Sequence, residues 1–286
     1  MKRCAAVLLF LFSCGAFSAA SAQEFPGLDA ALGAIQAQAQ AQKQEPQRPK
    51  VMGSERFAAA AAVLAPPAPD VTAYPVRGID VSHYEGAIAW DQLATAGLSF
   101  IVIKATEGET VTDQNFAANW QGATSAGLIK GAYHFYDFCD PGAPQADKFI
   151  KTVPVEAGTL PPTIDLEQSV DCSTMPARGA FRADLAAFVQ KLENAYGTAP
   201  ILYVNYAIYK AYFLGEDDPY KLWIADVSGA APAMPGGAGW SIWQYGWHGR
   251  VAGISGEVDL DAFNGTPEDL ASLAGRDPGV PLASAQ

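Results

Sequence analysis

Two carboxylates, Asp165 and Glu167, stand two residues apart in the short apolar segment 161–167. They alternate with Ile164 and Leu166. On a β-strand successive side chains point to opposite faces, so both acids share one face, with Cα atoms about 6.5 to 7 Å apart. Each carboxylate then feels the charge of the other, which separates their pKa values so that one stays protonated near neutral pH. A proton donor beside a charge stabiliser is what cleavage of a glycosidic bond requires. The alternative is a strand end with two solvated carboxylates.

The elements that must position these acids are strands that alternate with helices. Strand-like apolar runs recur at 76–81, 100–104, 129–135, 160–166, 201–206, 222–225 and 241–245. Apolar residues at helical spacing predict helices at 115–126 and 178–196, which end at Gly127 and Gly197. This α/β pattern predicts a parallel barrel or a doubly wound sheet, with its chemistry at the C-terminal ends of the strands. After Tyr206 the helical segments become short, which indicates a less regular second half.

The composition favours an exported protein. The chain has 286 residues and a formal net charge of -12, which argues against nucleic acid and anionic membrane surfaces as partners. Lys2 and Arg3 precede the apolar run 5–12, and Ala-Ser-Ala at 20–22 predicts cleavage before Gln23. The run is too short to span a membrane. A lipoprotein anchored through Cys14 is the alternative, but Phe12 is bulky for that cleavage box. We therefore expect a periplasmic or secreted protein.

Four segments are expected along the chain. Residues 1–22 form the signal peptide, and residues 23–70 form an Ala/Gln/Pro-rich linker that has too little apolar surface to fold. The barrel domain covers 71–273, and a flexible tail covers 274–286. Removal of the signal leaves two cysteines, Cys139 and Cys172, which in an exported protein predict a disulfide between two loops near the acids. Two free thiols are the alternative.

Six short motifs follow one another in the order known from one enzyme family. They are Gly-Ile-Asp-Val-Ser at 78–82, Ile-Lys-Ala-Thr-Glu-Gly at 103–108, Gly-Ala-Tyr-His-Phe at 131–135, Pro-Pro-Thr-Ile-Asp-Leu-Glu at 161–167, Trp-Gln-Tyr at 243–245 and Val-Asp-Leu-Asp at 258–261. Together they closely resemble glycoside hydrolase family 25, the Chalaropsis-type lysozymes. The resemblance implies a TIM-like β/α barrel that is irregular in its second half. It also implies an N-acetylmuramidase that needs no cofactor and acts on peptidoglycan glycan strands.

The resemblance also implies roles for individual acids. The family's Asp-x-Glu falls on Asp165 and Glu167, with Glu167 as the proton donor and Asp165 as the group that supports the developing positive charge by orienting the substrate's N-acetyl group. A covalent aspartyl species and assistance by the substrate's own acetamide are both compatible with this pair. Asp80 and Asp259 match two further carboxylates that line the site. Asp261 stands where family members often carry Asn, adds a negative charge beside Asp259, and is grouped with the substrate-binding residues.

Aromatic side chains supply candidate platforms for sugar rings. Tyr133, Tyr136, Tyr203 and Trp243 are expected to bind substrate, because aromatic faces stack on pyranose rings. Trp223 lies inside an apolar run, which favours a core position. No His-x-x-x-His or Cys-x-x-Cys motif indicates a metal site, so no metal is expected.

Other chemistries compete with this prediction. A nucleophile pair of Cys139 and His134 is conceivable, but a disulfide at Cys139 would exclude it. A chitin-type N-acetylglucosaminidase is a second candidate, weakened because the longer acidic signature of chitinases is missing. The third is a peptidoglycan-binding module that has lost catalysis, which the presence of all four acids argues against. The protein is expected to be a monomer. Lys104 and Glu107 are expected to form an ordinary ion pair.

Overall fold

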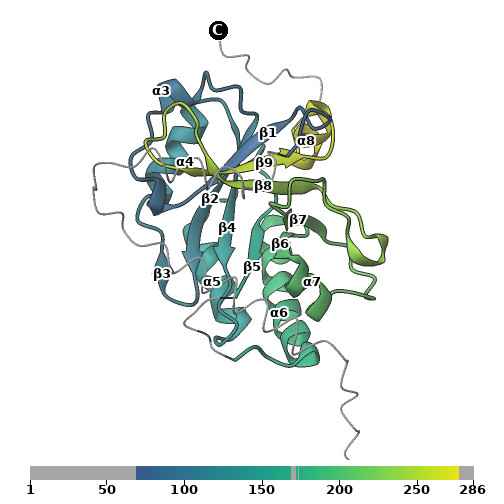
Figure 1. Ribbon diagram of the computed structural model, residues 1–286. Coiled ribbons are helices and arrows are strands. Elements are labelled where there is room, and N and C mark those ends of the chain that lie inside the picture. The colour runs from purple at the N-terminus through teal and green to yellow at the C-terminus, as the bar shows by residue number, and fades with distance from the viewer. Residues whose placement is uncertain (1–68, 169–171, 173, 277–286) are drawn as a thin grey trace, which may run out of the picture.

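A computed structural model of the chain describes residues 69–168, 172 and 174–276 (Figure 1). The expected signal peptide, the expected linker up to residue 68 and the last part of the tail, 277–286, lie outside these residues. The described strands and helices run from Arg77 to Leu273. None of the helices in this part of the chain has the length and apolar character that a membrane crossing needs.

Eight strands close into a barrel. They are β1 (Arg77–Val81), β2 (Phe100–Glu107), β4 (Ile129–Phe135), β5 (Thr163–Leu166), β6 (Ile201–Asn205), β7 (Lys221–Ala225), β8 (Ile242–Gly249) and β9 (Val258–Phe263). The strand order is β1-β9-β8-β7-β6-β5-β4-β2, and pairing of β1 with β2 closes the ring. The short strand β3 (Val111–Thr112) pairs with β2 outside this ring. The predicted TIM-like barrel is confirmed.

One strand runs against the others. Six pairings, from β1–β2 through β7–β8, are parallel, whereas β9 is antiparallel to both β8 and β1. The motif at 258–261 therefore lies on a strand that the apolar pattern alone did not predict. Because β9 reverses direction, its first residues lie beside the last residues of β1.

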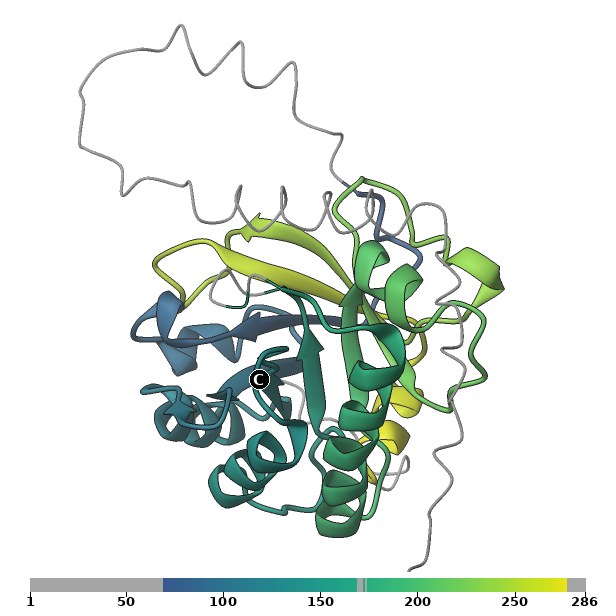
Figure 2. The same ribbon diagram turned by 90° about the horizontal axis from the view of Figure 1, so that it is seen from below.

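Helices cover the first half of the barrel more completely than the second. They are α3 (Trp90–Leu93), α4 (Phe116–Ser125), α5 (Gly142–Thr152), α6 (Arg178–Tyr196), α7 (Tyr206–Tyr212) and α8 (Pro267–Leu273). Two short 3-10 helices, η1 (His83–Glu85) and η2 (Pro235–Gly237), complete the set. Only η2 lies between β7 and β8, and residues 250–257 between β8 and β9 contain no helix. Figure 2 shows the teal and green helices packed around one side of the barrel. The second half has fewer and shorter helices, as predicted.

The longest helix shows why the sequence reading succeeded there. In α6 the apolar residues Phe181, Leu185, Phe188, Val189 and Leu192 are all buried, as helical spacing predicts. The helix ends at Gly197, whose φ of 70° lies in the left-handed region that glycine adopts without steric cost. The predicted bounds, 178–196, are confirmed.

Helix α5 was not predicted from the sequence, and it contains Gly142 and Pro144, two residue types that are unfavourable inside a helix. Both residues stand in its first turn, where backbone N–H groups have no partner inside the helix and proline is tolerated. The rest of the helix buries Gln145, Ala146 and Phe149 against the barrel. Because proline is tolerated in the first turn of a helix, Pro144 does not exclude a helix here, and the whole of α5 was missed.

The interior of the barrel is divided into an apolar part and a polar part. The apolar part is a cluster of buried side chains that includes residues from five strands, from α8 and from the position before β1: Val76, Phe100, Ile129, Ile201, Ile242, Phe263 and Leu270. Gly78 makes room for Phe100, because a Cβ on Gly78 would lie 2.4 Å from that ring. Farther along the same strands the inward positions turn polar, and these carry the candidate site.

Candidate active site

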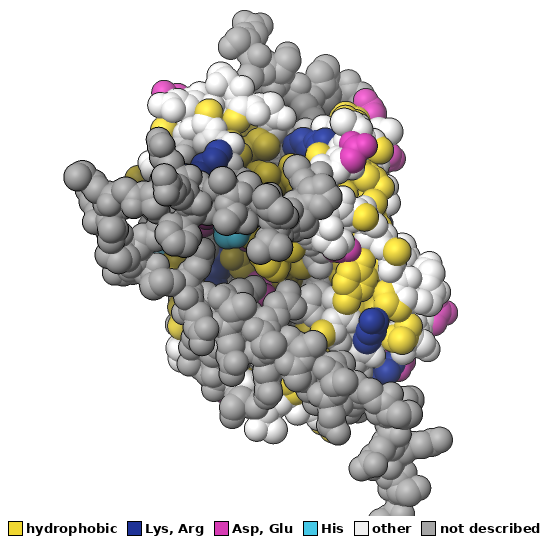
Figure 3. All heavy atoms as spheres, viewed as in Figure 1, with side chains coloured by type: hydrophobic (Ala, Val, Ile, Leu, Met, Phe, Trp, Pro, Cys, Tyr) yellow, Lys and Arg dark blue, Asp and Glu magenta, His cyan; other side chains and the backbone are white. Residues whose placement is uncertain are grey.

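A cavity of about 190 Å³ opens at the end of the barrel where the parallel strands finish. Five carboxylates line it: Asp80, Glu85, Asp165, Glu167 and Asp259. The other lining residues are Val81, Ser82, Tyr84, Lys104, Tyr133, Phe135, Tyr203, Trp223 and Gln244. Barrel enzymes carry their chemistry at this end, because the loops that follow the strands meet there. On the face shown in Figure 3 the visible acidic side chains are scattered over the surface.

Asp165 and Glu167 reach the cavity from the end of β5. Pro161 and Pro162 precede this strand, where their missing N–H groups cost no ladder hydrogen bond. Asp165 is buried, and its Oδ1 has no hydrogen-bond partner among the described residues. Glu167 is the first residue after β5 and is half-buried. Both acids line one cavity, as strand alternation requires.

The electrostatic surroundings of Asp165 couple it to Glu167. Burial, followed by the charge of Glu167, raises the pKa of Asp165 well above its ordinary value, while the nearby Lys104 ammonium lowers it. Neighbouring carboxyls that interact this strongly titrate as a unit, so the first proton bound serves the pair.

Asp80 and Asp259 face each other across the β1–β9 pairing, where the register places them directly opposite. Gln244 on β8 joins them, because its Nε2 donates to Asp80 Oδ2 at 2.8 Å and to Asp259 Oδ2 at 3.2 Å. Burial raises the pKa of Asp80 to about 7 and that of Asp259 to about 9. Near neutral pH Asp259 therefore holds a proton.

The orientation of the Gln244 amide is fixed by its other partners. Its Oε1 accepts hydrogen bonds from Tyr203 Oη at 2.8 Å and from Trp247 Nε1 at 3.0 Å. An indole N–H can only donate, so the amide oxygen must face Trp247 and the amide nitrogen must face the acids. Gln244 is thus a fixed donor to two carboxylates of the cavity wall. Gln244 belongs to the Trp-Gln-Tyr motif at 243–245, but no role was predicted for it from the sequence.

Comparisons with known proteins give this geometry a context. The sequence matches the family described as Glycosyl hydrolases family 25 over residues 79–254. The chain belongs to this family. Lysozyme M1 of Streptomyces globisporus is 37% identical over 211 residues, which cover 70% of this chain and 71% of that protein. The N,O-diacetylmuramidase of Chalaropsis sp is 32% identical over 205 residues, which cover 64% of this chain and 96% of that protein.

The fold gives the same assignment. The structure of a family 25 glycosyl hydrolase from Bacillus anthracis matches with a TM-score of 0.66 and 33% identity, covering 70% of this chain and 94% of that one. The family predicted from the six motifs is confirmed, and this family 25 chain is a glycoside hydrolase.

The aromatic candidates divide into two groups in this family 25 barrel. Tyr133 and Tyr203 line the cavity. Trp223 lines it as well, although its ring is buried as expected for a core residue. Burial and the surrounding acids raise the pKa of both tyrosines well above the ordinary value, so both hydroxyls keep their protons as hydrogen-bond donors.

Tyr136 and Trp243 do not line the cavity, which corrects their expected role as sugar platforms. Tyr136 is 1% exposed, packs against Phe181 with ring centroids 5.8 Å apart, and donates its hydroxyl hydrogen to Asp184. Trp243 is 0% exposed and donates from Nε1 to the Asp226 carbonyl at 2.6 Å. Trp243 adjoins Gln244 on β8, so alternation turns it outward while Gln244 faces inward.

Asp261 also does not line the cavity. Its side chain is 0% exposed and lies within the barrel, where its Oδ1 accepts a hydrogen bond from Trp223 Nε1 at 2.9 Å. It is thus placed behind the cavity wall rather than at a position that meets a sugar, which corrects its grouping with the substrate-binding residues.

The expected ion pair of Lys104 and Glu107 is present, with Nζ and Oε2 2.7 Å apart. Lys104 has a further position that the sequence did not suggest. It lines the cavity, with its Nζ 4.7 Å from the centre of the Phe135 ring. It is the cation among the lining residues, which include five carboxylates.

The rim of the cavity carries an exposed ring that sequence reasoning missed. Tyr84 is 81% exposed and lies against His83, with ring centroids 4.1 Å apart. Asp113 holds the His83 ring through an Nδ1–Oδ2 contact of 2.7 Å. Ser82 and Glu85 form a capping box around this turn, which fixes the backbone beneath the ring. The Tyr84 ring is therefore presented on a rigid support.

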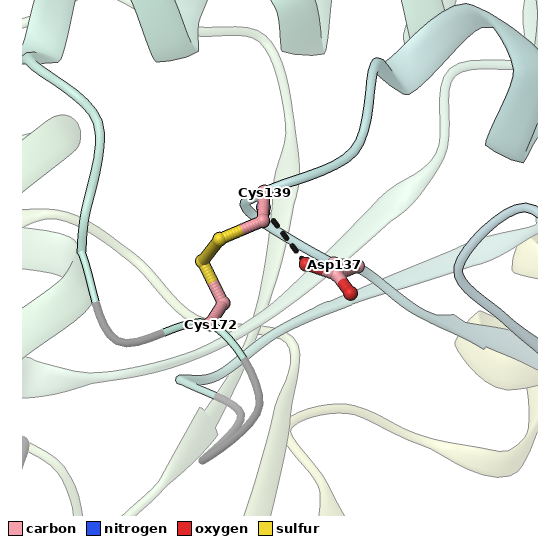
Figure 4. Close-up of side chains that lie close together, drawn as sticks. All are labelled: Asp137, Cys139 and Cys172. Carbon is pink, nitrogen blue, oxygen red and sulfur yellow. Dashed lines mark hydrogen bonds between the residues drawn. A yellow bond between two sulfur atoms is a disulfide. The ribbon is translucent and has the colours of Figure 1, made fainter.

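The predicted disulfide between Cys139 and Cys172 is present, with Cα atoms 5.6 Å apart (Figure 4). It joins the loop after β4 to the loop after β5. Among the described residues, Asp137, Cys139 and Cys172 are the group close enough to share a metal ion, but both sulfur atoms are used in the disulfide. The same bond removes Cys139 as a nucleophile. His134 is buried between Thr106 and Gln145, and burial lowers its pKa to about 4.

Proposed function

We propose that this family 25 enzyme cleaves the β-1,4 bond between N-acetylmuramic acid and N-acetylglucosamine in peptidoglycan. The names of its relatives, a lysozyme and an N,O-diacetylmuramidase, support this bond as the target. The observation that carries the proposal is the pair Asp165 and Glu167 in one cavity, with a buried Asp165 oxygen that lacks a partner. Such an oxygen costs free energy unless a ligand donates to it.

The two acids divide the work in this proposal. Glu167 gives its proton to the glycosidic oxygen as the bond to the leaving sugar breaks. In the reactive form Glu167 carries the proton of the pair, and charged Asp165, near the Lys104 ammonium, accepts a hydrogen bond from the acetamide N–H of the sugar that is cleaved. The acetamide is thereby oriented toward the anomeric carbon, where positive charge develops. Asp80 and Asp259, held by Gln244, shape the opposite wall and contact the same sugar.

Product analysis tests this function. The mature protein is incubated with purified peptidoglycan, and the reducing ends are identified by mass spectrometry. Reducing N-acetylmuramic acid is expected, and Glu167→Gln should lower the rate about 100- to 10,000-fold, as loss of a general acid does. Glu268→Gln is the control, because Glu268 is exposed on α8 at the other end of the barrel. Full activity of Glu167→Gln, or reducing N-acetylglucosamine alone, would refute the proposal. Faster cleavage of chitin oligomers would favour the N-acetylglucosaminidase.

The place of action follows from the same features. We place the enzyme in the periplasm or outside the cell, with peptidoglycan strands as its partner, because the disulfide requires an oxidising compartment to persist. The protein is proposed to act as a monomer. Light scattering after size exclusion tests that state, and fractionation of cells tests the compartment.

A further inference from the structure

Asp261 is the buried acid for which the proposed chemistry has no use. It lies on β9, opposite Gly78 of β1 and Gln244 of β8. Alternation along β9 turns it to the same side as Asp259, into the barrel. Its side chain is wholly buried, so no solvent compensates a charge there. A buried carboxylate of this kind needs hydrogen-bond donors or a cation.

The donors around Asp261 satisfy one of its two oxygens. Trp223 Nε1 donates to Oδ1, while Oδ2 is buried and has no partner if the group is ionised. Gln244 cannot help, because its two amide hydrogens are directed to Asp80 and Asp259. The cation of the cavity, Lys104, pairs with Glu107. An ionised Asp261 would therefore keep an unsatisfied, charged oxygen in the interior.

A different partner is available. The side chains of Asp80 and Asp261 lie within hydrogen-bonding reach of each other. Two carboxyl groups share a hydrogen bond only when one of them carries a proton. We propose that Asp261 is kept as the neutral acid and that its O–H group donates a hydrogen bond to Asp80. Asp261 is then a positioning residue for the Asp80 carboxylate in the cavity wall.

The charges on the neighbouring strands favour this assignment of the proton. Burial, together with the charges of Asp80 on β1 and Asp259 on β9, raises the pKa of Asp261 well above its ordinary value, whereas Trp223 on β7 lowers it. The pKa of Asp80 is raised less, to about 7, because it accepts hydrogen bonds from Gln244 and Asp261. Asp80 is thus the member of the pair that ionises first.

Carbon NMR of the carboxyl groups tests the proton directly. Protein labelled with ¹³C at the aspartate carboxyls is titrated from about pH 4 to about pH 8, a range in which an ordinary aspartate, with pKa about 3.9, is ionised. Asp261 is expected to give a signal that stays at the position of a neutral acid and is missing from Asp261→Asn. A signal missing from that variant that instead lies at the position of an ionised carboxylate from about pH 5 upward would overturn the proposal.

Two variants test the positioning role. An Asn side chain can donate to Asp80 and accept from Trp223, so Asp261→Asn should fold and retain activity within about threefold near pH 6. Asp261→Ala removes the donor and should lower activity more than tenfold. An unfolded Asp261→Asn protein, or one as impaired as Asp261→Ala, would contradict the role. This kinetic part rests on the proposed function, whereas the NMR result does not.

Discussion

The disulfide between Cys139 and Cys172 allows a stability change to be worked out from the structure. The two residues are 33 positions apart, so the bond closes a loop of that length in the unfolded chain. The chain-entropy relation gives about 3.7 kcal/mol of stabilisation at 25 °C for such a loop. For a domain of about 200 residues, each kcal/mol shifts Tm by about 2 to 4 °C. Removal of the bond should therefore lower Tm by about 7 to 15 °C.

Urea unfolding of two proteins measures this effect. The first is the double variant Cys139→Ser/Cys172→Ser, and the second is the wild type after reduction, which keeps both side chains and isolates the crosslink. Cys172 is fully buried, so the serine hydroxyl adds a cost of about 1 kcal/mol in the variant that the reduced protein does not have. Both should lose about 3 to 5 kcal/mol.

The bond should contribute to stability without taking part in the chemistry. Neither cysteine lines the cavity, so activity at low temperature should survive its removal. A loss of less than about 1 kcal/mol in the reduced wild type would refute the loop-entropy argument. Loss of activity in a reduced protein that remains folded would show that the rim loops must be joined for the site to form.

Three further changes test the site. Lys104→Met should raise the pKa of Asp165 and move the acid limb of the pH–rate profile for hydrolysis to higher pH, while Lys104→Arg should leave that limb in place. An unmoved acid limb in Lys104→Met would contradict the argument that the Lys104 charge lowers the pKa of Asp165. Asp259 has a folded-state pKa of about 9, so the contribution of its neutral form to stability is fully present below the unfolded pKa near 3.8 and is lost as pH rises from there to about 9. Urea midpoints should thus fall less from pH 5 to pH 9 in Asp259→Asn than in the wild type, and equal slopes would oppose this. Tyr84→Ala should raise KM for long glycan strands about two- to tenfold with kcat little changed, and Tyr84→Trp should not. A KM of Tyr84→Ala equal to that of the wild type would remove the ring from the substrate path.

Local sequence patterns were sufficient to predict an element where hydrophobicity alone decides its structure. The run at 129–135 and the helix at 178–196 are continuous apolar or periodic segments, and both were predicted with their observed bounds. The run at 258–263 alternates acids with apolar residues and was missed as a strand. Its charged side chains face the barrel interior, where a sequence pattern predicts apolar residues.

The positions of the site residues could be predicted from the sequence where strand alternation decides on which face of the sheet a side chain lies. Asp165 and Glu167 follow each other at a spacing of two, so their common cavity could be foreseen. The error at Trp243 had the same origin, because nearness to a strand end was used without asking which face the ring takes. Gln244 was passed over because a neutral amide gives no charge signal. Its importance comes from partners on β1, β6 and β9, which only the folded chain brings together.

The reversed direction of β9 fixes where the two ends of the catalytic barrel leave the molecule. In the register of β1 and β9, Arg77 pairs with Ala262 at the base, while Asp80 pairs with Asp259 at the cavity. Both the entry into the first strand and the exit from the last one therefore lie at the base, where Leu270 of α8 packs under the barrel. An eighth strand parallel to the others would instead have released the chain beside the acids. The enzyme can accordingly be fused or immobilised at either end of its barrel while the cavity stays open to a polymeric substrate.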